Sequence, residues 1–317
     1  VEPTAARTVA LTVEPTAART AVPAEPFAHP RTWQALARYV PEPEAFATEY
    51  WGRNPLVNRG ADPNAFRDLL DLDGVDELLS RRGLRTPFLR IVRDGTVLRS
   101  TEFTGPGGAG AEIADQVRDD RVATLFGQGA TIVLQGLPRT CPPIIERAAR
   151  LAEELGHPVQ ANAYITPPSS RGFSAHYDVH DVFVLQLAGR KQWTIHQPVH
   201  PDPLRDQPWN RYAEAVAERI RVDPPVIDTV LEPGDVLYLP RGWLHAAAAL
   251  GQISAHLTVG VHVVTRYALV EALTTLAGED EELRASLPLG IDVADPDALT
   301  SHLDEARSIL VAVLQAI

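Results

Sequence analysis

Six short apolar segments constrain the fold more than any other feature of this sequence. They lie at 158–165, 182–188, 192–196, 226–231, 236–239 and 253–264, and turns rich in Pro, Gly and Asp separate them. Strands of this length, divided by turns of this kind, are typical of an antiparallel sandwich or barrel. The sequence therefore predicts a mainly β protein.

Helical patterns flank the β-rich part. Before it, apolar residues recur at helical spacing within 33–82, where Asp62 or Pro63 is expected to open one helix and Asp73 another. After Arg266, leucines again recur at helical spacing. The predicted order is a helical lead-in, a β-rich core and a helical tail, and a helical stretch is also expected near residues 212–220 inside a long polar excursion at 199–225.

The charge balance narrows the class of partner. The chain has 29 basic and 41 acidic residues, a formal net charge of −12. Such a surface repels phosphate backbones, so no direct nucleic-acid partner is expected and a basic protein or peptide is. The single cysteine, Cys141, excludes an intramolecular disulfide, which fits a reducing cytoplasm. With no membrane-spanning run and no signal segment, a cytoplasmic protein is expected.

Two histidines and an aspartate form a candidate metal site. His176 and Asp178 are two residues apart, so on a strand their side chains would share one face. His245 follows another short apolar strand and can return across the barrel. Two imidazoles and one carboxylate on one face of a metal are the ligand set of non-haem Fe(II) oxygenases, which leaves positions open for a co-substrate and O₂.

Other interpretations of these histidines stay open. A strand histidine with an aspartate two residues on is more often a hydrogen-bonded pair than a metal site. His180 could replace Asp178 as a ligand or join it, and His256 and His262 share one strand face. His196 and His200 are interpreted as strand-end and loop residues.

Lys191 is the only lysine among the 29 basic residues. In a composition that uses arginine almost everywhere, a retained lysine suggests that arginine would not serve there. Lys191 follows a Gly-Arg turn and begins a predicted strand, where a cation could hold the far carboxylate of a dicarboxylate co-substrate whose other end chelates iron. The alternative is an exposed residue of a hairpin.

Four motifs together resemble the JmjC-type cupin family of ribosomal oxygenases. They are Asn162-Ala-Tyr-Ile-Thr-Pro167, His176-Tyr-Asp178, Leu185-Gln-Leu-Ala-Gly-Arg-Lys-Gln-Trp193 and Pro240-Arg-Gly-Trp-Leu-His245, in this order and at spacings like those of the family. The resemblance implies a double-stranded β-helix, the cupin or JmjC barrel, with a helical lead-in and a C-terminal helical dimerisation region. With a flexible arm at 1–25, which a near-duplicated stretch rich in Ala, Pro and Thr predicts, the chain divides into that arm, a catalytic domain at 26–266 and the dimerisation region at 267–317.

The same resemblance implies the site and its chemistry. The iron ligands fall on His176, Asp178 and His245, and no catalytic residue is expected beyond the metal centre. The 2-oxoglutarate contacts fall on Lys191 for the far carboxylate, with three polar neighbours: Asn162, Tyr164 and Thr258. Fe(II), 2-oxoglutarate and O₂ are therefore the expected cofactor and co-substrates, and the apolar stripes of the tail predict a homodimer.

The leading hypothesis is a dioxygenase that hydroxylates a histidine or arginine side chain of a ribosomal protein, since these are the substrates that the resemblance implies. The same core could hydroxylate a peptide or an amino acid in a biosynthetic pathway, and the excursion at 199–225 would separate these two functions. Cupin barrels also bind metals without oxygenase activity. A zinc hydrolase would not explain a lysine placed for a dicarboxylate.

Overall fold

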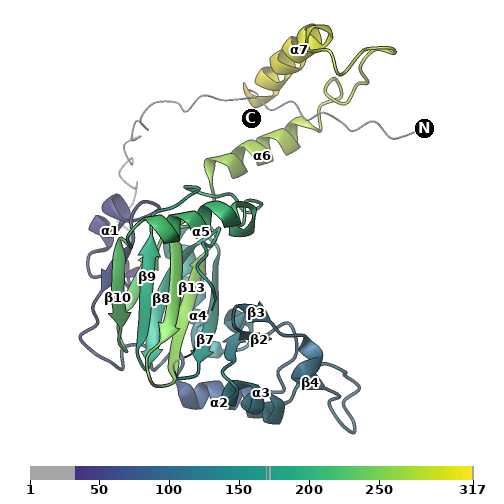
Figure 1. The fold of residues 1–317 in the computed structure, drawn as a ribbon. Helices are drawn as coiled ribbons and strands as arrows, with labels where there is room; N and C mark the ends of the chain where they lie inside the picture. The colour runs from purple at the N-terminus through teal and green to yellow at the C-terminus, as the bar shows by residue number, and fades with distance from the viewer. Residues whose placement is uncertain (1–32, 169, 171–172, 316–317) are drawn as a thin grey trace. The chain divides into compact units, whose positions relative to one another are not determined.

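The computed structural model describes residues 33–168, 170 and 173–315. The predicted flexible arm at 1–25 lies outside these residues. Within them, the elements follow the predicted order of helical lead-in, β-rich core and helical tail (Figure 1). No helix in this part of the chain is both long and apolar enough to cross a bilayer.

Two antiparallel sheets form the β-rich core. The larger sheet has the strand order β1-β11-β8-β13-β7-β6-β2-β3, and the smaller one has the order β10-β9-β12. Between β8 and β13 the chain passes repeatedly from one sheet to the other, which is the path of a double-stranded β-helix. The predicted fold class is confirmed.

The strands of the larger sheet are β1 (Leu56–Asn58), β11 (Val236–Leu239), β8 (Asp181–Ala188), β13 (Ser254–Val261), β7 (Val159–Thr166), β6 (Thr131–Leu134), β2 (Leu89–Arg93) and β3 (Thr96–Val97). Those of the smaller sheet are β10 (Ile227–Leu231), β9 (Lys191–His196) and β12 (Leu244–Ala249). A separate pair joins β4 (Thr104–Gly105) to β5 (Gln116–Val117).

Strand β8 is buried on both faces because it separates two cores. Val182 and Val184 point into an inner core between the sheets, where they meet Trp193 of the smaller sheet. Phe183 and Leu185 point the other way, into an outer core. This explains why the segment reads as a continuous apolar run and shows no alternation in the sequence.

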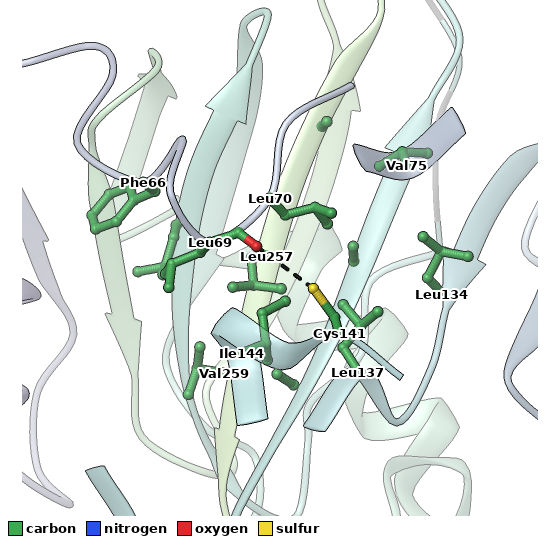
Figure 2. Packing of buried hydrophobic residues seen from close by; sticks show 14 of the residues in the cluster. Phe66, Leu69, Leu70, Val75, Leu134, Leu137, Cys141, Ile144, Leu257 and Val259 are labelled. Carbon is green, nitrogen blue, oxygen red and sulfur yellow. Dashed lines mark hydrogen bonds between the residues drawn. The ribbon is translucent and has the colours of Figure 1, made fainter. Parts of the chain in front are cut away.

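The outer core joins the larger sheet to the helical lead-in and to the helix before β7. Figure 2 shows Leu69 and Leu70 of the lead-in beside Leu257 of β13 and Ile144 of α4 (Pro142–Leu155). The thiol of Cys141 is buried here, 3.7 Å from the carbonyl oxygen of Leu69. The lead-in therefore covers the outer face of the barrel and leaves its interior free for a site.

The helices are η1 (Leu36–Arg38), α1 (Pro43–Glu49), α2 (Leu72–Arg81), η2 (Ser100–Glu102), α3 (Asp119–Gly127), η3 (Leu137–Arg139), α4 (Pro142–Leu155), η4 (Trp209–Tyr212), α5 (Ala213–Val222), α6 (Arg266–Ala277) and α7 (Pro296–Gln315). The helical stretch expected near 212–220 is α5, whose Val216 packs on Tyr177 and Leu244. Figure 1 shows α5 lying across the ends of the barrel strands.

Two expectations about helix starts in the lead-in were wrong. Residues 61–69 form turns and no regular helix, because the Asp62 carboxylate accepts the Asn64 N–H at 2.9 Å and closes a local turn there. The next helix is α2, but its N-cap is Asp71 and not Asp73. The Asp71 carboxylate accepts the Gly74 N–H at 2.8 Å.

The tail consists of the predicted helices. Helices α6 and α7 contact each other, yet large apolar side chains on both remain open to solvent. Leu269 is 59% exposed and Leu303 is 57% exposed, in contrast to the buried leucines of the barrel. The tail therefore presents apolar surface that the described chain does not cover.

Candidate active site

Three side chains that can bind a metal meet at one end of the barrel. One donor atom from each of His176, Asp178 and His245 lies within 4.8 Å of the others. Backbone pairing brings the two histidines together: the His245 N–H donates to the His176 carbonyl at 2.8 Å, and the His176 N–H donates to the His245 carbonyl at 3.2 Å. The structure thus gathers all three predicted ligands.

The local backbone differs from the expected strand. His176 forms only an isolated bridge with His245, and Asp178 lies in a loop before β8. The side chains converge because the Gly242 N–H donates to the Asp178 carbonyl at 3.0 Å, and because Tyr177 points away into a small apolar cluster. Long-range backbone contacts, and not strand alternation, set this geometry.

Both imidazoles are held in the orientation that a metal ligand needs. Nδ1 of His176 lies 2.7 Å from the Ser174 carbonyl, and Nδ1 of His245 lies 3.0 Å from the Trp243 carbonyl. A neutral ring that donates from Nδ1 leaves the Nε2 lone pair free. The Nε2 atom of His245 lies 3.8 Å from an Asp178 carboxylate oxygen, so both face the same space.

The protonation states at neutral pH suit a divalent cation. Burial, with the neighbouring His176, lowers the pKa of His245 to about 4, so this ring is neutral. Burial alone would raise the pKa of Asp178, but the nearby imidazoles of His180, His245 and His176 outweigh it and lower that pKa. A neutral imidazole at His245 and an ionised carboxylate at Asp178 are donor forms that bind iron, and with the His176 imidazole beside them these residues fit such a metal.

The other histidines of the described residues lie outside this cluster. His180 stacks on His262 with ring centroids 5.1 Å apart and contacts Gln160, so the structure does not favour it as a replacement for Asp178. His196 is buried at the end of β9, and His200 stacks on Tyr212. His256 lies deeper in the barrel, beside Lys191.

A cavity of about 250 Å³ leads from the metal ligands into the barrel and reaches Lys191. Lys191 is 2% exposed, so the alternative of an exposed hairpin residue was wrong. Its ammonium donates to the Thr166 hydroxyl at 3.1 Å and lies 3.4 Å from Nδ1 of His256. No acidic side chain of the described residues pairs with it, and burial lowers its pKa to about 7. A buried cation without an anion favours an anionic ligand.

The three predicted polar neighbours of Lys191 divide into two groups. Tyr164 and Thr258 line the cavity, and the Tyr164 ring stacks on His256 with centroids 4.9 Å apart. Asn162 lies on β7 opposite Thr258, but its carboxamide oxygen accepts the Gly136 N–H at 3.0 Å and the residue does not line the cavity.

Several cavity residues escaped sequence reasoning because they come from distant elements. Arg90 of β2 lines the cavity, and its Nε is buried without a hydrogen-bond partner among the described residues. Thr131 of β6 and Trp209 of η4 also line it. No motif marks them. Burial does not alternate along β6, and only partly along β2, so the strand patterns gave no signal of which side chains face inward.

Comparisons with known proteins agree with this geometry. Residues 141–269 match the family model described as JmjC domain. The chain is 30% identical over 258 residues to the bifunctional lysine-specific demethylase and histidyl-hydroxylase NO66 of Aedes aegypti, covering 78% of this chain and 38% of that protein. It is 32% identical over 260 residues to ribosomal oxygenase 1 of Rattus norvegicus, covering 78% and 40%. The chain therefore carries a JmjC domain and is similar to ribosomal oxygenases over most of its length.

Solved structures of JmjC ribosomal oxygenases share the fold. The structure of Escherichia coli ribosomal oxygenase YcfD has a TM-score of 0.51 at 18% identity, with 86% of this chain and 66% of that chain covered. A structure of YcfD in complex with cobalt and 2-oxoglutarate has a TM-score of 0.50, also at 18% identity and with the same shares covered. The chain spans about two fifths of the length of the curated family members described above.

Proposed function

We propose that this protein is an Fe(II)- and 2-oxoglutarate-dependent dioxygenase that hydroxylates a protein side chain. The observation that carries the proposal is the pairing of two features in one cavity. Three donors suited to Fe(II) lie at its mouth, and a buried lysine without an anionic partner lies at its inner end. A metal-binding cupin of another kind has no need for that lysine.

The metal would be held by His176, Asp178 and His245. When bound, Fe(II) would supply the activation of O₂, coupled to oxidation of 2-oxoglutarate to succinate and CO₂, that inserts one oxygen atom into a substrate C–H bond. The chain contributes placement: Nδ1 contacts orient both imidazoles, and the backbone bridge fixes their separation. Accurate placement matters because a shift of about an ångström can cost on the order of a hundredfold in rate.

Lys191 would neutralise the far carboxylate of 2-oxoglutarate. Its ammonium, the Thr166 hydroxyl and His256 form a polar end to the cavity, and the apolar side chains of Val182, Val184 and Trp193 are part of its wall. Apolar walls exclude water and strengthen the attraction between the ammonium and a carboxylate. Tyr164 and Thr258 would be further polar contacts, whereas Asn162 would act indirectly by holding the Gly136 backbone.

The proposed substrate is a histidine or arginine side chain of a ribosomal protein. Relatives of the chain carry the names histidyl-hydroxylase and ribosomal oxygenase. The net charge of −12 would steer a basic protein toward the enzyme. At the mouth of the cavity, Phe173 and Trp209 lie near His176, with ring centroids 5.7 and 6.4 Å from it. Flat aromatic faces suit a planar imidazole or guanidinium group.

The tail at 267–317 would be a dimerisation region, as part of a cytoplasmic homodimer. The exposed leucines of α6 and α7 support this proposal, because apolar stripes on helices are usually buried against a partner. Sedimentation of the wild type should give twice the monomer mass. A Leu269→Asp, Leu303→Asp double variant should sediment as a monomer, and a monomeric wild type would contradict the proposal.

The proposed function is tested first by anaerobic calorimetry of 2-oxoglutarate binding to the Mn(II)-loaded protein. Binding should require the metal and should weaken about tenfold or more in Lys191→Ala, because a charge-assisted contact is lost. Arg190→Ala is the matched control, since it removes a neighbouring cation that pairs with Glu232 at the surface. Absence of binding to the wild type would reject the co-substrate.

The substrate is tested by mass spectrometry of ribosomal proteins incubated with the Fe(II)-loaded enzyme, 2-oxoglutarate and O₂. A gain of one oxygen atom on a histidine or arginine would support the proposal. Succinate release that depends on a small peptide or an amino acid, without any modified ribosomal protein, would favour the biosynthetic alternative.

A further inference from the structure

Asp181 is a buried carboxylate that takes no part in the chemistry proposed above. It opens β8, three residues after Asp178, and its side chain is inaccessible to solvent. The Arg241 backbone N–H donates to Oδ1 at 3.0 Å, and the Tyr238 hydroxyl donates to Oδ2 at 2.5 Å. Through these contacts it joins the segment of two metal ligands to the turn that leads into the third.

The turn between Tyr238 and His245 has further contacts, because the Arg241 guanidinium pairs with Asp202 at 3.6 Å and the Trp243 indole N–H donates to the Arg53 carbonyl at 3.2 Å. Gly242 adopts a φ of +87°, and its N–H donates to the Asp178 carbonyl at 3.0 Å. The Trp243 carbonyl then receives Nδ1 of His245 at 3.0 Å. The position of Arg241 therefore helps to fix the positions of Gly242 and Trp243. These two residues contact Asp178 and His245 directly.

Both partners of Asp181 are donors, so the position requires an acceptor on each oxygen. The Arg241 N–H can only donate. The Tyr238 hydroxyl accepts the Gly52 N–H at 2.8 Å, which directs its own hydrogen toward Asp181. An asparagine would set its amide N–H groups against one of these donors and leave a buried polar group unsatisfied.

We infer that Asp181 is a positioning residue for the metal centre: its carboxylate fixes the turn that carries His245 relative to the loop that carries His176 and Asp178. The inference rests on the proposed function, because it concerns the metal that these three ligands would hold. Its consequence is that Asp181→Asn should weaken metal binding even though Asp181 touches no ligand side chain.

Asp235 provides a matched control on the same pair of strands. In the β8–β11 pairing Val182 faces Leu239 at one end and Leu185 faces Val236 at the other, so Asp181 and Asp235 flank opposite ends. Asp235 is also buried, and it too accepts only from donors: Gly60 N–H at 2.9 Å, Glu232 N–H at 3.1 Å and Arg59. Replacing it by asparagine damages the fold in a similar way but away from the metal ligands.

The experiment compares Mn(II) affinity, by calorimetry at a temperature where every variant is folded, with the Tm of the metal-free protein. Both Asp181→Asn and Asp235→Asn should lower the Tm. Only Asp181→Asn should raise the Kd for Mn(II), by about tenfold or more, as residues that orient metal ligands do. It alone should also change the visible absorption of the Co(II)-loaded protein, which reports ligand geometry.

Equal Mn(II) affinity in Asp181→Asn and the wild type would overturn the inference, and so would equal weakening in both variants. If Asp181→Asn does not fold, Tyr238→Phe decides: it removes one of the two donors, so its Kd should exceed that of Asp235→Asn, and a Kd no higher would overturn the inference. Failure of the wild type to bind Mn(II) is a distinct result, because it would reject the proposed function itself.

Discussion

The two ends of the cavity are built with opposite electrostatics. At the mouth, His176 and the neutral His245 lie beside the ionised Asp178, a set of donors that lacks a cation. At the inner end, Lys191 is buried with only the Thr166 hydroxyl and His256 as polar contacts, a cation that lacks an anion. A chelating dicarboxylate bound to a metal would satisfy both ends at once. One cavity thus connects two incomplete sites of opposite charge.

The largest effect is expected from a variant that loses a metal ligand at the mouth of the cavity and keeps the inner end intact. His245→Ala should weaken Mn(II) binding by at least about a hundredfold, since loss of a ligand costs more than loss of a residue that supports one. Hydroxylation should fall with it. His262→Ala is the control, because His262 is exposed and lies outside the ligand cluster. Calorimetry with Mn(II) measures the difference in affinity. Unchanged Mn(II) binding in His245→Ala would mean that the proposed ligands at the mouth do not hold the metal.

The second prediction tests the charge of Lys191 at the inner end through the pH dependence of 2-oxoglutarate affinity. Burial lowers the pKa of Lys191 to about 7, and a bound carboxylate would raise it again, so binding above that pH must take up a proton. Affinity for 2-oxoglutarate should be nearly constant below about pH 7 and should fall by about tenfold per pH unit above it. Calorimetry in buffers of different ionisation enthalpy measures the proton uptake.

Lys191→Arg sharpens this test. Arginine stays protonated over the accessible range, so the variant should bind more weakly but without the pH dependence. A wild type whose affinity does not change between pH 7 and 8.5 would show that Lys191 is already charged before the ligand arrives.

A smaller effect is expected from the hydroxyl beside the lysine. Thr166→Val keeps the shape but removes the oxygen that accepts from the Lys191 ammonium, a loss of about 1 kcal/mol, or roughly fivefold in 2-oxoglutarate affinity. Metal affinity should not change. Thr131→Val serves as the control, since Thr131 contacts Thr166 and not the lysine. Equal effects of the two variants would mean that the Thr166 contact contributes nothing specific.

The smallest effect concerns the protein substrate alone. Trp209→Ala removes an aromatic ring at the mouth, which should raise the KM for a protein substrate by roughly fivefold, about 1 kcal/mol, and leave 2-oxoglutarate affinity unchanged. Tyr212→Ala is the matched change, because Tyr212 stacks on His200 and does not line the cavity. Steady-state kinetics with a hydroxylatable ribosomal protein measures both.

The fold class could be predicted from the apolar segments, and the candidate ligands from the motifs, but the backbone around the ligands could not. Strand β12, which carries His245, was not among the expected strands because its run of four alanines has low β-propensity. Pairing with β9 overrides that propensity. The loop around His176 was expected to be a strand, since nothing local shows that only a single bridge forms there.

The parts of the cavity that could not be predicted come from contacts between distant segments. Arg90 and Trp209 reach the cavity only because β2 extends the larger sheet and η4 lies at the barrel mouth. The burial of Lys191 likewise depends on the crossing of β9 into the smaller sheet, which strand patterns alone do not specify. Hydrophobic periodicity identifies elements, whereas the partners of each face are set by tertiary packing.

The double burial of β8 has a consequence for how this site can change. Val182 and Val184 line the cavity, while Phe183 and Leu185, between and beyond them, belong to the outer core. Strand β8 alone therefore separates the cavity from the outer core at this point. Close-packed interiors transmit strain, so a shift on one face of the strand affects the other. Substitutions in the lead-in helices can therefore change the shape of the cavity without contacting it. Sequence changes far from the site can in this way alter which substrate the protein prefers.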